Sequence, residues 1–257
     1  MKNFIKSGNK IFISPKGMEY ELENGRVYTL KYNEWEGAAY FEINENINIP
    51  NKIYGNNYDS FINRILQWHK RDDVNNTGVL LSGMKGSGKT LTSKIIAKKS
   101  DLPIIIVDNN FPSRKLSDTF KKISGNYCMI FDEIDKNERY WDSSQLLGFL
   151  DGIETVCKKL VLFTCNDENF ANENLIDRCS RIRYYKKFEG LDNNSISNLI
   201  NEIIKDDKKK QMRCLDLINK FKVKSFDNIV NFLHEVQLYP DSKELDLLND
   251  LNIEIQN

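Results

Sequence analysis

The stretch that most constrains the fold is GMKGSGKT, Gly83 to Thr90, because it stands between an apolar run and a helical pattern. The preceding TGVLLSG reads as a buried strand, and the following TLTSKIIAKKS reads as a helix. A glycine-rich turn in that setting is the first unit of a parallel α/β sheet covered by helices on both faces. Further strands are predicted at 103–109, 127–133, 160–166 and 181–185, and further helices at 58–71, 113–123 and 143–159.

The same stretch fits GxxxxGK[ST], a pattern suited to binding nucleotide phosphates. Glycines let successive backbone N–H groups curl around phosphate oxygens, and the helix N-terminus adds its dipole. Lys89 is expected to reach the β- and γ-phosphates, and Thr90 to place its hydroxyl on Mg²⁺. The alternative is a glycine-rich turn that binds nothing. The predicted phosphate-binding set is Gly83, Met84, Lys85, Gly86, Ser87, Gly88, Lys89, Thr90 and Leu91.

A second motif, YCMIFDEID, places two carboxylates directly after an apolar strand. Ligands of parallel sheets bind at the carboxyl ends of the strands, so these acids are expected beside the phosphates. Asp132 is predicted to hold Mg²⁺, and Glu133 to act as the base or orienting group for an attacking water. The alternative is a strand that merely ends in solvated acids. Together the motifs predict ATP and Mg²⁺ as cofactors and ATP hydrolysis as the activity.

Composition excludes several other classes. The 257 residues carry 37 basic and 37 acidic side chains, so a strongly basic nucleic-acid binder is not indicated, although a local basic patch is compatible with this balance. No apolar run approaches the ~20 residues of a membrane helix, and the N-terminus lacks a signal-peptide core. We therefore expect a cytoplasmic protein without a membrane partner. The 5 cysteines form no CxxC pair and are expected to be buried thiols.

Changes of pattern divide the chain into three predicted modules. Residues 1–52 read as a small β module for partner recognition, with a two-residue type I′ turn at Asn24-Gly25. Residues 53–187 form the α/β nucleotide-binding core, and residues 188–257 form a helical lid. Asp192 and Ser225 are predicted helix N-caps.

These motifs resemble those of the AAA+ ATPase superfamily of P-loop NTPases, with GMKGSGKT as the Walker A element and MIFDE as Walker B. LVLFTCN is similar to the sensor 1 strand of that family, which implies that Asn166 contacts the γ-phosphate or the attacking water. A turn-forming Asn before Asp167 is the alternative. The resemblance covers residues 53–185 strongly and the helical tail weakly.

Within that resemblance, NLIDRCSRIRYY falls where the family carries arginine fingers. It implies that Arg178 or Arg181 acts in the active site of a neighbouring subunit, and hence a homo-oligomeric ring, commonly of six subunits. For Arg181 the alternative is an exposed strand edge with alternating charges. Which arginine is the finger stays open, with a slight preference for Arg178.

Other segments refine the resemblance. LLGFLDGIET resembles the AAA clade, especially ATPases like the mitochondrial Rieske-protein translocase, whereas the CSR segment is similar to clamp loaders. IYGNNYDSFINRIL resembles the segment that wraps adenine, which implies base contacts from Tyr54 and Gly55. Asn228 and Ile229 stand where the lid helix often has its sensor 2 arginine, and Phe111 is either a pore or a core aromatic. The Lys, Asn and Ile bias suggests an AT-rich genome, such as that of a virus, in which case the location would be the host cytoplasm.

The leading hypothesis is a Mg²⁺-dependent ring ATPase that remodels a protein or protein–nucleic acid partner. The first alternative is a DNA replication accessory ATPase that loads a clamp or a helicase. A nucleotide-gated scaffold with slow turnover is the second. The sequence does not identify the partner, the oligomer number or a threading pore.

Overall fold

The computed structural model describes residues 4–13, 21–54, 58–123, 125–137, 150, 157–167, 182–205 and 207–256. These residues fall into two compact units. The first unit comprises residues 1–49, 58–82 and 89–187, and the second comprises residues 50–57, 83–88 and 188–257. Each unit has its own hydrophobic core.

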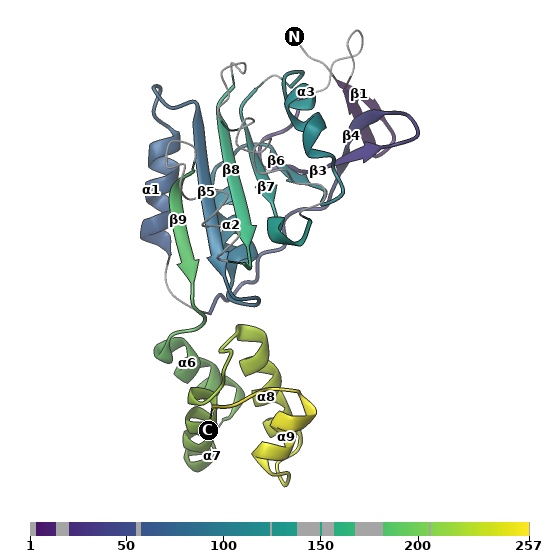
Figure 1. The fold of residues 1–257 in the computed structure, drawn as a ribbon. Coiled ribbons are helices and arrows are strands. Elements are labelled where there is room, and N and C mark those ends of the chain that lie inside the picture. Colours follow the sequence, from purple (N-terminus) through teal and green to yellow (C-terminus); the bar gives the residue numbers. More distant parts are fainter. Residues whose placement is uncertain are drawn as a thin grey trace. The chain divides into compact units, whose positions relative to one another are not determined.

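A single sheet forms the first unit (Figure 1). In the described part of the chain it has nine strands in the order β1-β2-β4-β3-β6-β7-β8-β5-β9. The strands are β1 (Phe4–Ser7), β2 (Lys10–Ile13), β3 (Val27–Asn33), β4 (Ala38–Ile43), β5 (Asn76–Gly83), β6 (Ile104–Val107), β7 (Tyr127–Phe131), β8 (Lys159–Cys165) and β9 (Ile182–Phe188). Strands β3, β6, β7, β8 and β5 are successive parallel neighbours, so the predicted α/β fold with a parallel sheet is confirmed.

Helices cover this sheet because its central strands are apolar on both faces. All residues of β7 and β8 are buried, which a strand achieves only when each face of the sheet is packed. Helix α2 (Lys89–Lys99) packs against these two strands, and α1 (Asp59–His69) packs against α2. Helix α1 also lies beside β9, where the hydroxyl of Tyr184 donates to the carbonyl oxygen of Arg64 at 3.2 Å. The short helix α3 (Leu116–Phe120) follows β6.

The N-terminal strands continue the core sheet. Strand β3 pairs in parallel with β6, in the register Val27 with Ile104 and Leu30 with Val107. Strands β4, β2 and β1 then add antiparallel neighbours outside β3. Strands β1 to β4 therefore share one sheet and one compact unit with the core.

The predicted type I′ hairpin turn at Asn24-Gly25 is wrong. Gly25 has φ +72° in a turn, but Asn24 is not among the non-glycine residues with positive φ, as a type I′ turn requires. Residues 21–23 are not a strand, and the antiparallel partner of β3 is β4. The hairpin loop is therefore the stretch Glu34–Gly37.

Four helices form most of the second unit: α6 (Asn193–Ile203), α7 (Lys208–Asn219), α8 (Phe226–Leu238) and α9 (Glu244–Asp250). Their apolar faces build a separate core, which includes Ile196, Phe221 and Phe232. Both predicted N-caps are confirmed. The carboxylate of Asp192 accepts from Ser195 N at 2.7 Å, and the hydroxyl of Ser225 accepts from Asn228 N at 3.1 Å.

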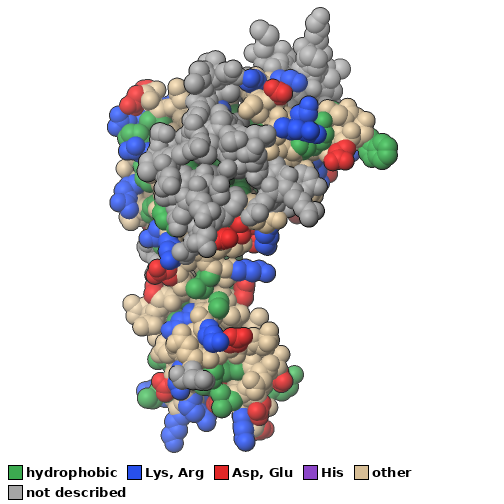
Figure 2. All heavy atoms as spheres, in the orientation of Figure 1, with side chains coloured by type: hydrophobic (Ala, Val, Ile, Leu, Met, Phe, Trp, Pro, Cys, Tyr) green, Lys and Arg blue, Asp and Glu red, His purple; other side chains and the backbone are tan. Residues whose placement is uncertain are grey.

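On the face shown in Figure 2, basic and acidic side chains are intermixed over the described surface, in line with the balanced charge of the sequence. Within the described residues, no helix is long and apolar enough to cross a membrane.

Candidate active site at the carboxyl edge of the sheet

The predicted phosphate loop connects β5 to α2. Three of its glycines, Gly83, Gly86 and Gly88, have φ values of +130°, +72° and +95°. This left-handed region favours glycine because a side chain there clashes with the backbone. The three positive φ values bend the backbone of this loop repeatedly, as the sequence motif predicts.

At Gly83 the backbone leaves no room for a side chain, and at Gly86 a Cβ atom would make a tight contact. A Cβ atom on Gly83 would lie 2.1 Å from the carbonyl oxygen of Phe188, and one on Gly86 would lie 3.1 Å from Asp227 Oδ2. The carbonyl oxygen of Gly86 accepts from Phe226 N, the first residue of α8, at 3.1 Å. All these residues belong to the second compact unit, so the phosphate loop is part of the packing of that unit.

The loop offers groups that suit a polyphosphate. The hydroxyl oxygen of Ser87 is buried and, among the described residues, it has no hydrogen-bond partner. A buried polar atom without a partner indicates a site that a ligand completes. Lys89 is only 5% exposed, and this burial lowers the pKa of its ammonium group, while the charges of Asp135, Glu133 and Asp132 oppose the shift. A desolvated cation of this kind is stabilised by a neighbouring anion.

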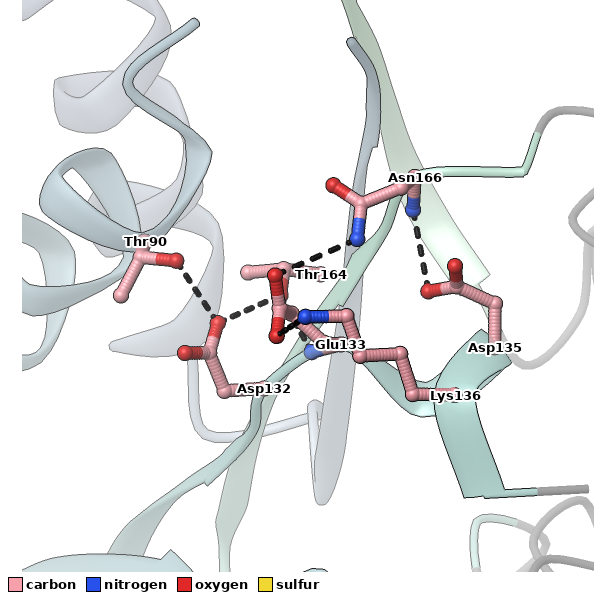
Figure 3. A network of polar contacts seen from close by, with 7 residues as sticks. All are labelled: Thr90, Asp132, Glu133, Asp135, Lys136, Thr164 and Asn166. Carbon is pink, nitrogen blue, oxygen red and sulfur yellow. Dashed lines mark hydrogen bonds and ion pairs between the residues drawn. The ribbon is translucent and has the colours of Figure 1, made fainter. Parts of the chain in front are cut away.

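Thr90 and Asp132 supply a matched pair of oxygen atoms for Mg²⁺. The Thr90 hydroxyl donates to Asp132 Oδ1 at 2.8 Å, which brings the start of α2 to the end of β7 (Figure 3). Mg²⁺ prefers oxygen ligands and is commonly held by one or two protein groups together with substrate phosphates. The donor set therefore fits the predicted ion, and the structure brings the two predicted metal residues into contact.

Glu133 is fixed next to this pair by the neighbouring strand (Figure 3). Its backbone has φ +51°, which is uncommon for a residue with a side chain. Thr164 on β8 accepts from Glu133 N at 2.7 Å and donates to Asp132 Oδ1 at 2.5 Å. One threonine hydroxyl thus ties both carboxylate residues to β8, which stabilises the unusual backbone.

Asn166 completes the arrangement. Its side-chain Nδ2 donates to Glu133 Oε1 at 3.3 Å, and its backbone N donates to Asp135 Oδ1 at 3.0 Å. Lys136 forms an ion pair with Glu133 Oε2. The structure therefore brings together Thr90, Asp132, Glu133 and Asn166, all predicted from sequence.

The sequence interpretation missed Thr164, Asp135 and Lys136. The signal for Thr164 was present, because alternate residues of a strand share a face, and Thr164 precedes Asn166 by two positions. The register of β7 and β8, Phe131 with Phe163, then places Thr164 opposite Asp132. That register depends on pairing between distant segments, which local periodicity does not encode.

The predicted base contact Tyr54 belongs to the second unit. Its ring stacks on Phe226, with centroids 5.9 Å apart, and its hydroxyl donates to Glu202. Tyr54 lines a surface cavity of about 560 Å³ together with Lys52, Ile53, Ser195, Asn198, Asn201 and Glu202. The adenine-binding role stays a prediction.

Three predicted site residues, Gly55, Arg178 and Arg181, lie outside the described residues. Phe111, for which pore and core positions were both open, is fully buried and packs edge-on against Tyr32 with centroids 6.0 Å apart. It is a core residue.

One protein family matches part of the chain. Residues 79–187 match the family described as "ATPase family associated with various cellular activities (AAA)". An ATP-dependent zinc metalloprotease FtsH from Trieres chinensis is 34% identical over 100 residues, which is 30% of this chain. The chain spans only 16% of the length of that protein.

Solved structures show a similar fold. The FIGL-1 AAA domain in complex with ADP aligns with a TM-score of 0.52 and 18% identity, covering 81% of this chain and 82% of that domain. A mutant of Thermotoga maritima RuvB aligns with a TM-score of 0.52 and 14% identity, covering 76% of this chain and 69% of the other.

The fold and the site together define a P-loop nucleoside triphosphatase. Residues 79–187 match the AAA ATPase family, which supports ATP binding and ATP hydrolysis, and the oxygen atoms of Thr90 and Asp132 suit Mg²⁺. The matched range does not include residues 4–78, which contain β1 to β4. It also does not include residues 188–256, which contain the helices of the second unit.

Proposed function

We propose that this chain is a ring-forming AAA+ ATPase that uses ATP hydrolysis to remodel a protein or protein–nucleic acid partner. The observation that supports it most is the network at the ends of β7 and β8, in which Glu133 is held beside Asp132 by Thr164 and Asn166. A structural turn would not need a carboxylate fixed by two hydrogen bonds and a left-handed backbone.

In this proposal the chain mainly positions reactants, because phosphoryl transfer depends on alignment and charge neutralisation. The loop N–H groups and Lys89 bind the phosphates. Thr90 and Asp132 would hold Mg²⁺, which would supply positive charge near the phosphates. The Glu133 carboxylate accepts a proton of the attacking water, and Asn166 donates its amide hydrogen to keep that carboxylate oriented.

Two variants test this assignment. Lys89→Ala should lose ATP binding, measured with a fluorescent ATP analogue, because the buried ammonium that faces the phosphates is removed. Glu133→Gln should bind the analogue with unchanged affinity and release phosphate at least about 100-fold more slowly, because the water loses its base. The exposed Glu45 offers a matched control, since Glu45→Gln should hydrolyse normally. Undiminished phosphate release by Glu133→Gln would contradict the proposed role of Glu133 as the base.

The ring and the finger arginines belong to this proposal. Similarity to AAA+ proteins supports an oligomeric ring, and the hexamer, Arg178 and Arg181 remain predictions from the resemblance. The likeness to the Rieske-protein translocase, the viral origin and the cytoplasmic location also remain predictions from the sequence. Tyr54 is proposed as the base contact, supported by the polar side chains around its cavity.

A second candidate function, action on DNA, is favoured by one surface of the first unit. Strand β9 exposes Arg183, Tyr185 and Lys187, and the guanidinium of Arg183 lies 3.3 Å from the ring centre of Trp68 on α1. Basic side chains interleaved with aromatic ones suit single-stranded nucleic acid. Hydrolysis stimulated by DNA, with a stimulation that falls steeply as salt rises, would favour this candidate. Equal rates with and without DNA would exclude it.

A further inference from the structure

The loop of the β3–β4 hairpin presents a tryptophan to solvent. Trp35 is 100% exposed, the largest exposed fraction among the large hydrophobic side chains of the described residues. Tryptophan is usually well buried, since its indole carries a large apolar surface. A tryptophan in this state is a candidate anchor for another macromolecule.

The turn at the tip of this hairpin is held by hydrogen bonds. Asn33 Oδ1 accepts from Trp35 N at 3.1 Å and from Glu36 N at 3.4 Å, which closes the turn from within. Gly37 has φ +62°, the left-handed conformation that returns the chain into β4. An anchor held by such a turn loses little conformational freedom when it binds.

The base of the hairpin is fixed in the core. Leu30 and Phe41, which pair across the two strands, are both fully buried. Tyr32 packs edge-on against buried Phe111. A force on the tip would therefore be transmitted to the sheet that carries the active site.

The hairpin continues beyond its neighbour β6 at the carboxyl end of β3. Pairing of β3 with β6 ends at Leu30 and Val107, so β3 continues for roughly 10 Å without that neighbour. Because β3 runs parallel to β6, β7 and β8, it ends at the edge where Asp132 and Asn166 follow their strands. Figure 1 shows this hairpin at the right-hand end of the sheet.

The charge around the indole is acidic. Glu34 and Glu36 flank Trp35, both are exposed, and within the described residues neither forms an ion pair. The nearest basic residue along β3, Lys31, is already paired with Glu42 at 2.6 Å. Phosphate groups of nucleic acid or anionic lipid would be repelled here, whereas lysine or arginine would be attracted.

From these features we propose that the Trp35 tip docks a polypeptide segment of the remodelled partner in which aliphatic or aromatic side chains stand beside lysine or arginine. The apolar side chains cover the indole, and the basic ones pair with Glu34 and Glu36. This inference rests on the proposed remodelling function, and it assigns partner recognition to one loop.

The test uses the full chain with Trp68→Phe and Trp141→Phe, so that Trp35 is the remaining one of the 3 tryptophans. Three labelled synthetic peptides of equal length serve as probes: leucine and phenylalanine with lysine and arginine, the same apolar residues with aspartate and glutamate, and lysine and arginine with serine. The first peptide should shift Trp35 emission to shorter wavelength and bind more weakly as salt rises. The other two should bind far more weakly.

Variants locate the binding. Trp35→Ala should weaken binding of the first peptide about 30-fold, the size expected for a central tryptophan anchor. Glu34→Lys with Glu36→Lys should weaken that peptide and strengthen the acidic one. Tyr239→Ala, which removes another exposed aromatic (53%), is the matched control and should bind as the parent does. ATP hydrolysis without peptide should be unchanged in all of them.

Several outcomes would overturn the inference: binding of the first peptide by Trp35→Ala within twofold of the parent, equal binding of all three peptides, or a Trp35 emission shift with phosphatidylcholine–phosphatidylserine vesicles instead. A shift that follows protein concentration alone, with loss of oligomers in Trp35→Ala, would assign the tip to contacts between copies and overturn it as well. Absence of hydrolysis in every variant, with peptide binding intact, would contradict the proposed function but leave this inference standing.

Discussion

At the scale of single residues, the active site depends on hydroxyl groups as much as on charges. Thr90 and Thr164 both donate to Asp132 Oδ1, from α2 and from β8. This leaves the second carboxylate, Glu133, to be oriented from Asn166 and Lys136. The two acids that adjoin in sequence therefore have different surroundings, which is the condition for different roles.

Thr164 gives the sharpest residue-scale prediction. Thr164→Ala leaves Glu133 N without its acceptor and frees the backbone that aims the carboxylate, so kcat should fall about 10- to 100-fold. The affinity for ATP should change little, because the phosphate loop is intact. Steady-state phosphate release measures both parameters. Thr164→Ser keeps the hydroxyl and should stay near wild type; an equal loss in both variants would show that packing of the methyl group matters instead.

His69 predicts how stability depends on pH. Burial, with a smaller contribution from the charge of Lys158, lowers the pKa of His69 to about 4 from 6.5, and Nδ1 contacts Thr77 Oγ1 at 3.0 Å. Between these values the unfolded chain binds the extra proton and the folded chain does not. The free energy of unfolding should therefore fall as pH drops from 6.5 towards 4, by about 3 kcal/mol at most.

Urea unfolding at several pH values between about 7 and 4 measures this dependence. His69→Gln should remove most of the slope, because the titrating group is gone, whereas the exposed His234→Gln should keep it. A parallel pH profile in parent and His69→Gln would assign the slope to carboxylates.

At the scale of elements, the phosphate loop is constrained by its packing as well as by its ligand. Gly83 and Gly88 both need left-handed φ, but a Cβ would meet the carbonyl of Phe188 at Gly83 and nothing within 4 Å at Gly88. A comparison of alanine substitutions at the two glycines therefore distinguishes the cost of backbone strain from the cost of steric collision.

Gly83→Ala should therefore destabilise the protein more than Gly88→Ala. The strain alone costs about 1–2 kcal/mol, and the collision adds to it because backbone atoms must move. Thermal unfolding followed by circular dichroism compares the variants. Equal losses of Tm would mean that the carbonyl group of Phe188 moves away from Gly83 at no cost in free energy.

The elements around the site were predictable because their signals are local. The glycine motif, the apolar strands and the caps at Asp192 and Ser225 each lie within a few residues of the feature they predict. The hairpin around Trp35 was not predicted, since Asn24-Gly25 is the stronger turn signal and the β3–β4 pairing competes with it. Likewise the parallel pairing of β3 with β6 joins Val27 to Ile104, a partner that no local pattern identifies.

At the scale of the whole molecule, the proposed ring makes activity a property of neighbouring chains. If Arg178 or Arg181 acts in the next subunit, its alanine variant should bind ATP normally and hydrolyse it poorly, because transition-state charge is not neutralised. Mixing that variant with Lys89→Ala chains should restore part of the phosphate release, since some interfaces then combine an intact site with an intact finger. If the mixture releases phosphate only at the sum of the rates of the two separate variants, an active site shared between subunits would be contradicted.

Strands β1 to β4, which extend the sheet beyond β6, have a consequence for solubility. Strand β6 reads IIIV, and its two neighbours in the sheet are β7 and β3. Without residues 1–49, one side of β6 would offer unpaired backbone along a short, uncharged, β-branched strand, which is the kind of edge that recruits other chains. A chain that starts at residue 50 should scatter light at concentrations where the full chain stays clear. The N-terminal strands are thus expected to keep β6 from pairing with other chains.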